Sequence, residues 1–185
     1  IMTITQSNIT AAGLTAGIMA DMGEQNEIHI DNSYVFSEGT FSGIMARSAI
    51  TITGSEVIVP VTGDPEMLLS SFDANIPYSG ILIMETGPMT ITDSSITIDG
   101  GPYALGAQIL HIRSSIIDIS NCIYGIVGLE DLLIEDCEHI HVSTGTIMGD
   151  LVLPLGVSIP FGPSAIIPFW CDVIIRNCSD VMADG

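Results

Sequence analysis

The stretch from Ile28 to Ser37, IHIDNSYVFS, decides the fold that this sequence predicts. Apolar residues alternate with polar ones, an Asn-Ser pair interrupts them, and the alternation then resumes. A period of two places every second side chain on one face of a β-strand. The stretch therefore predicts two short strands joined by a sharp bend.

Seven copies of this pattern run along the 185-residue chain. Each copy has an anchor residue, and the anchors are Ser7, Ser33, Ser55, Ser94, Ser115, Cys137 and Cys178. The six spacings between anchors are 26, 22, 39, 21, 22 and 41 residues, so the basic unit is 21 or 22 residues and two units carry long insertions. A repeat of this size built from strands indicates a solenoid in which each repeat forms one coil.

Two columns of the aligned copies support this interpretation. An isoleucine stands three residues before every anchor, at positions 4, 30, 52, 91, 112, 134 and 175, and alternation places it inside. The residue directly before each anchor is Gln6, Asn32, Gly54, Asp93, Ser114, Asp136 or Asn177. Asn, Asp and Gly tolerate positive φ, so we expect the bend at this position.

A third short strand is expected ten to twelve residues after the anchor at Gly17-Ile18-Met19 and Gly43-Ile44-Met45, and nine to eleven residues after it at Tyr103-Ala104-Leu105 and Tyr124-Gly125-Ile126. Three strands per coil with an Asn-type bend resembles the right-handed parallel β-helix superfamily, the pectate-lyase-like solenoids, over essentially the whole chain. The resemblance points to no specific member. It implies an all-β, right-handed parallel β-helix of about seven coils with 21–22 residues per coil. It implies little about function, because pectate lyases and many surface proteins share this fold.

We expect one domain over residues 1–185, with long loop insertions at about 60–79 and 146–165. Both insertions leave the coil at the same place, so they should stand on one side of the solenoid and border a groove. Neither end of the pattern shows a cap for its strand edges. The expectation is therefore that the chain belongs to a longer protein, or that it associates end to end with other copies.

The charge balance restricts the partners. The chain has 22 acidic residues, three arginines and no lysine, which gives a formal net charge of −19. This charge repels nucleic acid, and it disfavours polyuronates unless a divalent cation bridges the two. Calcium is accordingly the one cofactor that the sequence leaves open. The composition suits an extracellular or cell-surface protein.

Residues Leu151 to Trp170 form an uncharged segment of twenty residues, the length of a membrane-spanning helix. The segment contains Pro154, Pro160, Pro163 and Pro168. Four prolines do not fit a regular spanning helix whose backbone must satisfy its own hydrogen bonds. We therefore expect a folded-back apolar loop and no membrane span.

The groove is the strongest candidate for a binding surface. Its candidate ligand-binding residues are Tyr103, Tyr124, Asp99, Asp118, Tyr78 and Trp170. Tyr103 and Tyr124 stand nine residues after their anchors and should stack on adjacent coils. Aromatic faces with a few carboxylates can hold a sugar ring through apolar contact and hydrogen bonds. The alternative is that the tyrosines form an ordinary stabilising ladder.

The sequence predicts neither catalytic residues nor a metal site. Glycosidases need a pair of carboxylates, one on each side of the bond that is cleaved. The third strands of this chain are apolar and offer no such pair. Charged residues stand only at the ends of these strands, on different coils, at Asp21, Arg47, Glu85 and Glu130. There is no Cys/His spacing of a zinc site. Cys137 and Cys178 share an inward column on successive coils, which leaves a stacked thiol pair or a disulfide open.

Arg113, Glu135 and Arg176 occupy one outward column and alternate in sign. We expect an exposed salt-bridge ladder that stabilises the fold by about 0–1 kcal/mol per pair.

The function that these patterns favour is a non-catalytic extracellular or cell-surface module, of the adhesin type or binding carbohydrate. Two alternatives stay open. One is a polysaccharide lyase or glycoside hydrolase, and the other is a structural surface-layer or filament scaffold.

Overall fold

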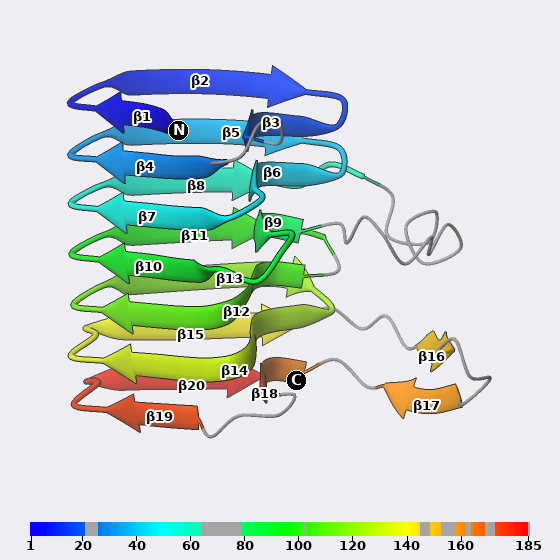
Figure 1. The fold of residues 1–185 in the computed structure, drawn as a ribbon. Coiled ribbons are helices and arrows are strands. Elements are labelled where there is room, and N and C mark those ends of the chain that lie inside the picture. The colour runs from blue at the N-terminus through cyan, green and yellow to red at the C-terminus, as the bar shows by residue number, and fades with distance from the viewer. Residues whose placement is uncertain are drawn as a thin grey trace.

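The computed structural model describes residues 1–20, 26–63, 79–101, 103–144, 149–152, 158–161, 164–168 and 173–184. All regular structure within these ranges is β-strand (Figure 1), so they hold no helix that could cross a membrane. The strands form an 11-stranded sheet, a 7-stranded sheet and one two-stranded sheet. Every pairing in the two large sheets is parallel.

The two large sheets consist of three stacks of strands. The first stack contains β1 (Met2–Thr5), β4 (Glu27–Asp31), β7 (Ala49–Thr53), β10 (Pro88–Thr92), the second parts of β12 (Tyr103–Arg113) and β14 (Tyr124–Glu135), and β19 (Val173–Arg176). The second stack is the 7-stranded sheet of β2 (Asn8–Gly13), β5 (Tyr34–Gly39), β8 (Glu56–Pro60), β11 (Ser95–Asp99), β13 (Ile116–Cys122), β15 (His139–Thr144) and β20 (Asp180–Asp184). The third stack contains β3 (Ala16–Ala20), β6 (Ser42–Ala46), β9 (Ser79–Ile83), the first parts of β12 and β14, and β18 (Ser164–Pro168). Separately, β16 (Gly149–Val152) pairs antiparallel with β17 (Ser158–Phe161).

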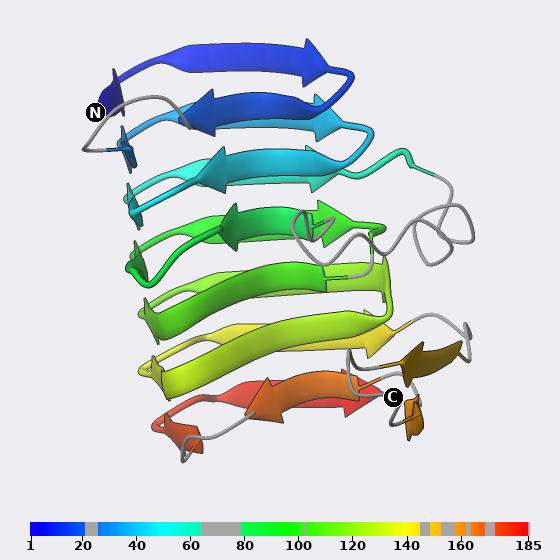
Figure 2. The same cartoon turned by 45° about the vertical axis from the view of Figure 1, so that its right-hand side comes forward.

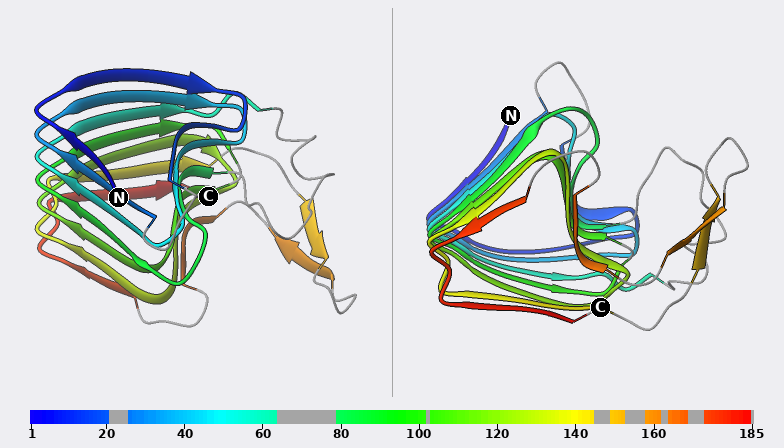
Figure 3. Two further views of the ribbon diagram at one scale, coloured as in Figure 1. Left: turned by 45° about the horizontal axis from the view of Figure 1, so that its top comes forward. Right: turned by 90° about the horizontal axis from the view of Figure 1, so that it is seen from below.

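The long strands β12 and β14 join the first and third stacks into the 11-stranded sheet. This sheet folds back on itself so strongly that, with the 7-stranded sheet, it closes around the interior (Figure 3, right). Successive turns of chain lie one below the other from the N-terminus to the C-terminus (Figure 2). The interior is filled by aliphatic side chains from all three stacks.

The isoleucine column predicted from the repeat is confirmed. Strand register pairs Ile4, Ile30, Ile52, Ile91, Ile112, Ile134 and Ile175 in one continuous file. From Ile30 to Ile134 these side chains are at most 1% exposed, whereas Ile175 in the last repeat is 40% exposed. Burial of aliphatic surface stabilises a fold by about 25 cal/mol per Å², so the middle of the file contributes most.

The predicted bends are also confirmed. All seven residues that precede an anchor have φ between 45° and 56°. Gly54 adopts this conformation without a steric penalty, and Asn32 is one of the residues that tolerate it well. Gln6 and Ser114 are less suited to it, and only their place in the repeat identifies them as bend residues.

The anchor serines form a continuous hydrogen-bonded ladder between repeats. The Ser94 hydroxyl donates to the carbonyl of Thr92 at 2.7 Å and accepts the backbone N–H of Ser55 at 3.2 Å. Ser33, Ser55 and Ser115 repeat this pair of bonds with their own neighbours. The ladder therefore satisfies buried backbone groups at the bend, where the strand pairing is interrupted.

Ser94→Ala is expected to lower the free energy of unfolding by about 2 kcal/mol, because it leaves the buried Ser55 N–H without its acceptor. Urea denaturation followed by circular dichroism measures the loss. Ser94→Cys is the matched control and should cost less, since cysteine occupies the equivalent position in the last two repeats. A loss below about 0.5 kcal/mol for Ser94→Ala would contradict a structural role for the ladder.

The third strand differs from the expectation in two repeats. It is a separate five-residue strand in β3, β6 and β9. In contrast, β12 and β14 continue for 11 and 12 residues from the third stack into the first stack of the next repeat. A register shift between Ala107 and Ile109 takes up the irregularity where the chain turns.

Candidate functional site

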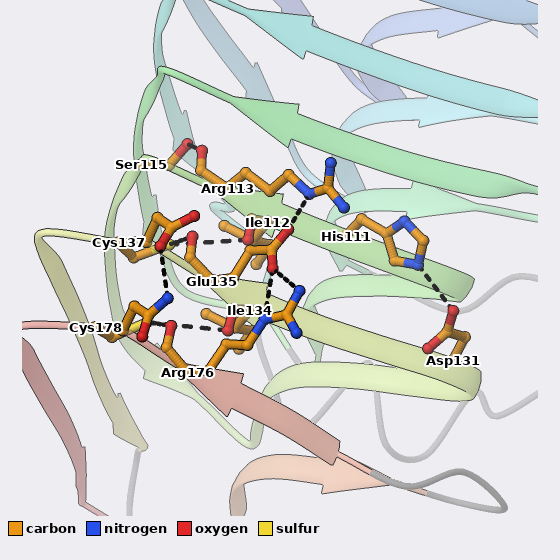
Figure 4. Close-up of polar contacts among 12 residues, drawn as sticks. His111, Ile112, Arg113, Ser115, Asp131, Ile134, Glu135, Cys137, Arg176 and Cys178 are labelled. Atoms are coloured by element: carbon orange, nitrogen blue, oxygen red, sulfur yellow. Dashed lines mark hydrogen bonds and ion pairs between the residues drawn. The ribbon is translucent and has the colours of Figure 1, made fainter.

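All three arginines of the chain are engaged by carboxylates from neighbouring repeats. The Nε atom of Arg47 lies 2.5 Å from Oε1 of Glu85. Glu135 binds the other two arginines, with Arg113 Nε at 2.5 Å from its Oε1 and Arg176 Nε at 2.7 Å from its Oε2 (Figure 4). Each arginine thus contacts a carboxylate, with Arg113 and Arg176 sharing the single charge of Glu135, and the excess of acidic residues over the whole chain favours an uncharged ligand over an anionic one.

The charge ladder was expected to be exposed, and for Glu135 this was wrong. Its side chain is only 9% exposed, while the side chains of Arg113 and Arg176 are 50% and 58% exposed. The two arginines lie on either side of Glu135 in strand register, so their side chains shield it from solvent. Glu135 is therefore the buried centre of a three-residue ion cluster.

A groove of about 380 Å³ opens on the outer face of the third stack. Its floor and walls include Leu82, Tyr103, Gly106 and Val127, and Glu85 and Gln108 are among its polar lining residues. Leu82, Gly106 and Val127 are register partners on three successive strands, on the face opposite the interior isoleucines. An apolar groove with an aromatic wall and a few polar groups is typical of small-ligand sites.

The two tyrosines predicted to stack do so. Their ring centroids lie 5.0 Å apart with an interplanar angle of 33°. Tyr103 lines the groove, whereas Tyr124 is 8% exposed and packs with Ile123 and Val127. Burial raises the pKa of Tyr103, and burial together with Tyr103 raises the pKa of Tyr124 to about 12. Both phenols are therefore neutral hydrogen-bonding groups at physiological pH.

The predicted aspartates lie on the 7-stranded sheet, away from the sheet that carries the tyrosines. Asp99 ends β11, and its Oδ1 accepts hydrogen bonds from Ser120 Oγ at 2.8 Å and Asn121 Nδ2 at 2.6 Å. Asp118 on β13 lies 3.6 Å from the Nδ1 atom of His141. These contacts stabilise the sheet between repeats. Tyr78 and Trp170 lie outside the described residues.

The groove contains polar side chains that the protein does not use. Within the described part of the chain, no hydrogen bond engages the side chains of Tyr103, Thr86 or Gln108, all of which line the groove. Glu85, in contrast, is held by Arg47 at the groove. The hydroxyl and amide groups are therefore available to a ligand.

The buried thiol of Cys137 is not arranged for reactive chemistry. Strand register pairs Glu135 with Arg176 and His139 with Asp180. Cys137 and Cys178 stand between these two pairs in adjacent repeats, so they are neighbours, and both carry free thiols. Burial, the largest cause, and the neighbouring Cys178 together raise the pKa of Cys137 to about 11. A protonated thiol is a poor nucleophile and a poor metal ligand. Among the residues described, no group of three or more His, Cys, Asp or Glu could hold a metal ion.

Sequence reasoning missed the groove residues Leu82, Gly106 and Gln108. A signal for Gly106 was present, because alignment of the third strands places this glycine between Leu82 and Val127. A missing side chain in an otherwise apolar column indicates a hollow. Sequence alignment alone could not have shown that Gln108 lines the same hollow, because the register irregularity between Ala107 and Ile109 turns the chain there.

Comparisons with protein-family models, curated proteins and solved structures found no match to this chain.

Proposed function

We propose that this chain is a right-handed parallel β-helix module of an extracellular or cell-surface protein, and that it binds a neutral carbohydrate without catalysing a reaction. The parallel register of the isoleucine file and the stacked turns support the β-helix description. The groove beside Tyr103 is the observation that carries the function.

The composition of the groove favours a sugar over a purely apolar ligand. The ring of Tyr103 can lie against the apolar face of a sugar, while Gln108 and Thr86 offer hydrogen bonds to its hydroxyl groups. The volume of about 380 Å³ lies at the lower end of the range for ligand sites and suits a short segment of a glycan. None of the three arginines lines the groove, so a uronate or sulfate group meets no arginine there.

A glycan array probed with and without Ca²⁺ tests this function. We expect binding to neutral glycans that is unchanged by chelation of Ca²⁺. Tyr103→Leu removes the flat aromatic wall and should weaken binding about ten-fold, which corresponds to 1.4 kcal/mol. Tyr34→Leu is the matched control, since Tyr34 belongs to the 7-stranded sheet and does not line the groove.

Other outcomes of the array separate the alternatives. Cleavage of a bound glycan would favour a polysaccharide lyase or hydrolase. The absence of binding to any glycan would favour a structural scaffold. One observation on the last two strands supports this alternative. In the described part, β19 and β20 are paired on one side only, and Ile174, Ile175, Val181 and Met182 are 40–47% exposed. Such an edge can pair with a further layer of strands.

A further inference from the structure

Gly106 is unusual because nothing in its backbone requires glycine. Its φ lies outside the left-handed region, unlike that of Gly100 and Gly101 nearby. Its register partners on the neighbouring strands are Leu82 and Val127. Any L-residue could adopt the backbone conformation, so the effect of glycine at this position is the space that it leaves.

That space opens into the groove. Among the described residues, leaving aside the two chain neighbours of Gly106, only Leu82 Cδ1 lies within 4 Å of the position that a Cβ on Gly106 would take, at 3.2 Å. Leu82 and Val127 are 6% and 5% exposed, so the walls of the notch are apolar and well packed. We name this hollow, bounded by Leu82, Gly106 and Val127, the glycine notch.

An amide side chain stands close to the glycine notch in sequence and in space. Gln108 lies two residues after Gly106 and lines the same groove. Its side chain makes no hydrogen bond within the described residues. A primary amide both donates and accepts, so it can form two complementary hydrogen bonds with another amide.

We propose that the glycine notch is a specificity subsite for the acetamido group of an N-acetylated sugar. This proposal rests on the carbohydrate-binding function proposed above. The acetamido methyl fills the space above Gly106 and contacts Leu82 and Val127. The amide of the substituent pairs with Gln108, and the sugar ring lies against Tyr103. A hydroxyl group at the same carbon cannot fill the apolar notch. The acetamido group is also neutral, which the acidic surface requires.

A comparison of N-acetylglucosamine with glucose tests the subsite by NMR titration of the ¹⁵N-labelled chain. We expect at least ten-fold tighter binding of N-acetylglucosamine, with chemical-shift changes at the Gly106 and Gln108 resonances. Gly106→Leu fills the notch and should weaken N-acetylglucosamine binding at least ten-fold. Gln108→Leu removes the amide partner and should reduce the preference for the N-acetylated sugar. The same spectra report whether each variant is folded, and Gln108→Leu carries the test if Gly106→Leu does not fold.

Met19→Leu is the matched control, because Met19 lies in the same outward column but is not part of the groove. Equal affinities for the two sugars at the groove would overturn the subsite and leave the carbohydrate-binding function standing. Undiminished N-acetylglucosamine binding by folded Gly106→Leu and Gln108→Leu would do the same. Binding of neither monosaccharide, nor of any neutral glycan on the array, would overturn both proposals.

Discussion

Ile91→Ala is expected to lower the free energy of unfolding by about 4 kcal/mol, the upper part of the range for a buried isoleucine. Ile91 is fully buried, with Ile52 and Ile112 as register partners on its two sides. Removal of its outer carbons leaves a cavity between neighbours that strand pairing holds in place, so the site can collapse only partly. Urea denaturation at constant m-value measures the change.

The same column supplies the control for this prediction. Ile175→Ala makes the identical chemical change at a side chain that is 40% exposed, and it should cost less than about 1 kcal/mol. The ratio between the two losses is the informative quantity, because it depends on burial within one file of residues. Comparable losses at both positions would show that the contribution of these isoleucines to stability does not decrease from the centre of the file to its last repeat.

The isoleucine file could be predicted from sequence because it depends on strict repetition. Each isoleucine stands at the same distance from its anchor, and parallel pairing of identical repeats places equal positions side by side. The same reasoning located the bends, including those at Gln6 and Ser114, which residue type alone would not identify.

Relations within one repeat were harder to predict than relations between repeats. Asp99 and Tyr103 are only four residues apart, yet they belong to different sheets. Between them, Gly100 and Gly101 have φ of 90° and 88° and turn the chain. The sequence indicates that a turn occurs here, but the direction that the chain takes depends on packing of both sheets. The prediction that the aspartates lie beside the tyrosines did not allow for this turn, which places the two groups on different sheets.

Burial of a polar residue is similarly set by its neighbours. Glu135 stands in an outward column, which alone predicts exposure. The structure buries it because a long side chain lies over it from each adjacent repeat, and arginine can cover surface in this way while its charged end stays in water. Alternation thus predicts the face of a strand and leaves the exposure on that face undetermined.

Glu135→Lys is expected to lower the free energy of unfolding by about 3 kcal/mol, the lower end of the range for a disrupted buried ion pair. The substitution places a third cation between Arg113 and Arg176, where Glu135 now binds both. The two arginines are about half exposed, so solvent reduces the repulsion and the larger values in that range are not expected. Thermal and urea unfolding both measure the loss.

Glu85→Lys separates this local effect from the general effect of charge. Both variants change the net charge of −19 by the same amount, but Glu85→Lys breaks one carboxylate–arginine pair and Glu135→Lys breaks two. The Glu85 side chain is 53% exposed, so its pair with Arg47 should contribute only about 0–1 kcal/mol. Because the general reduction in acidic repulsion is common to both variants, the difference between them measures the buried cluster alone. Equal stabilities for the two variants would mean that Glu135 is solvated like Glu85, and that the covering arginines do not shield it.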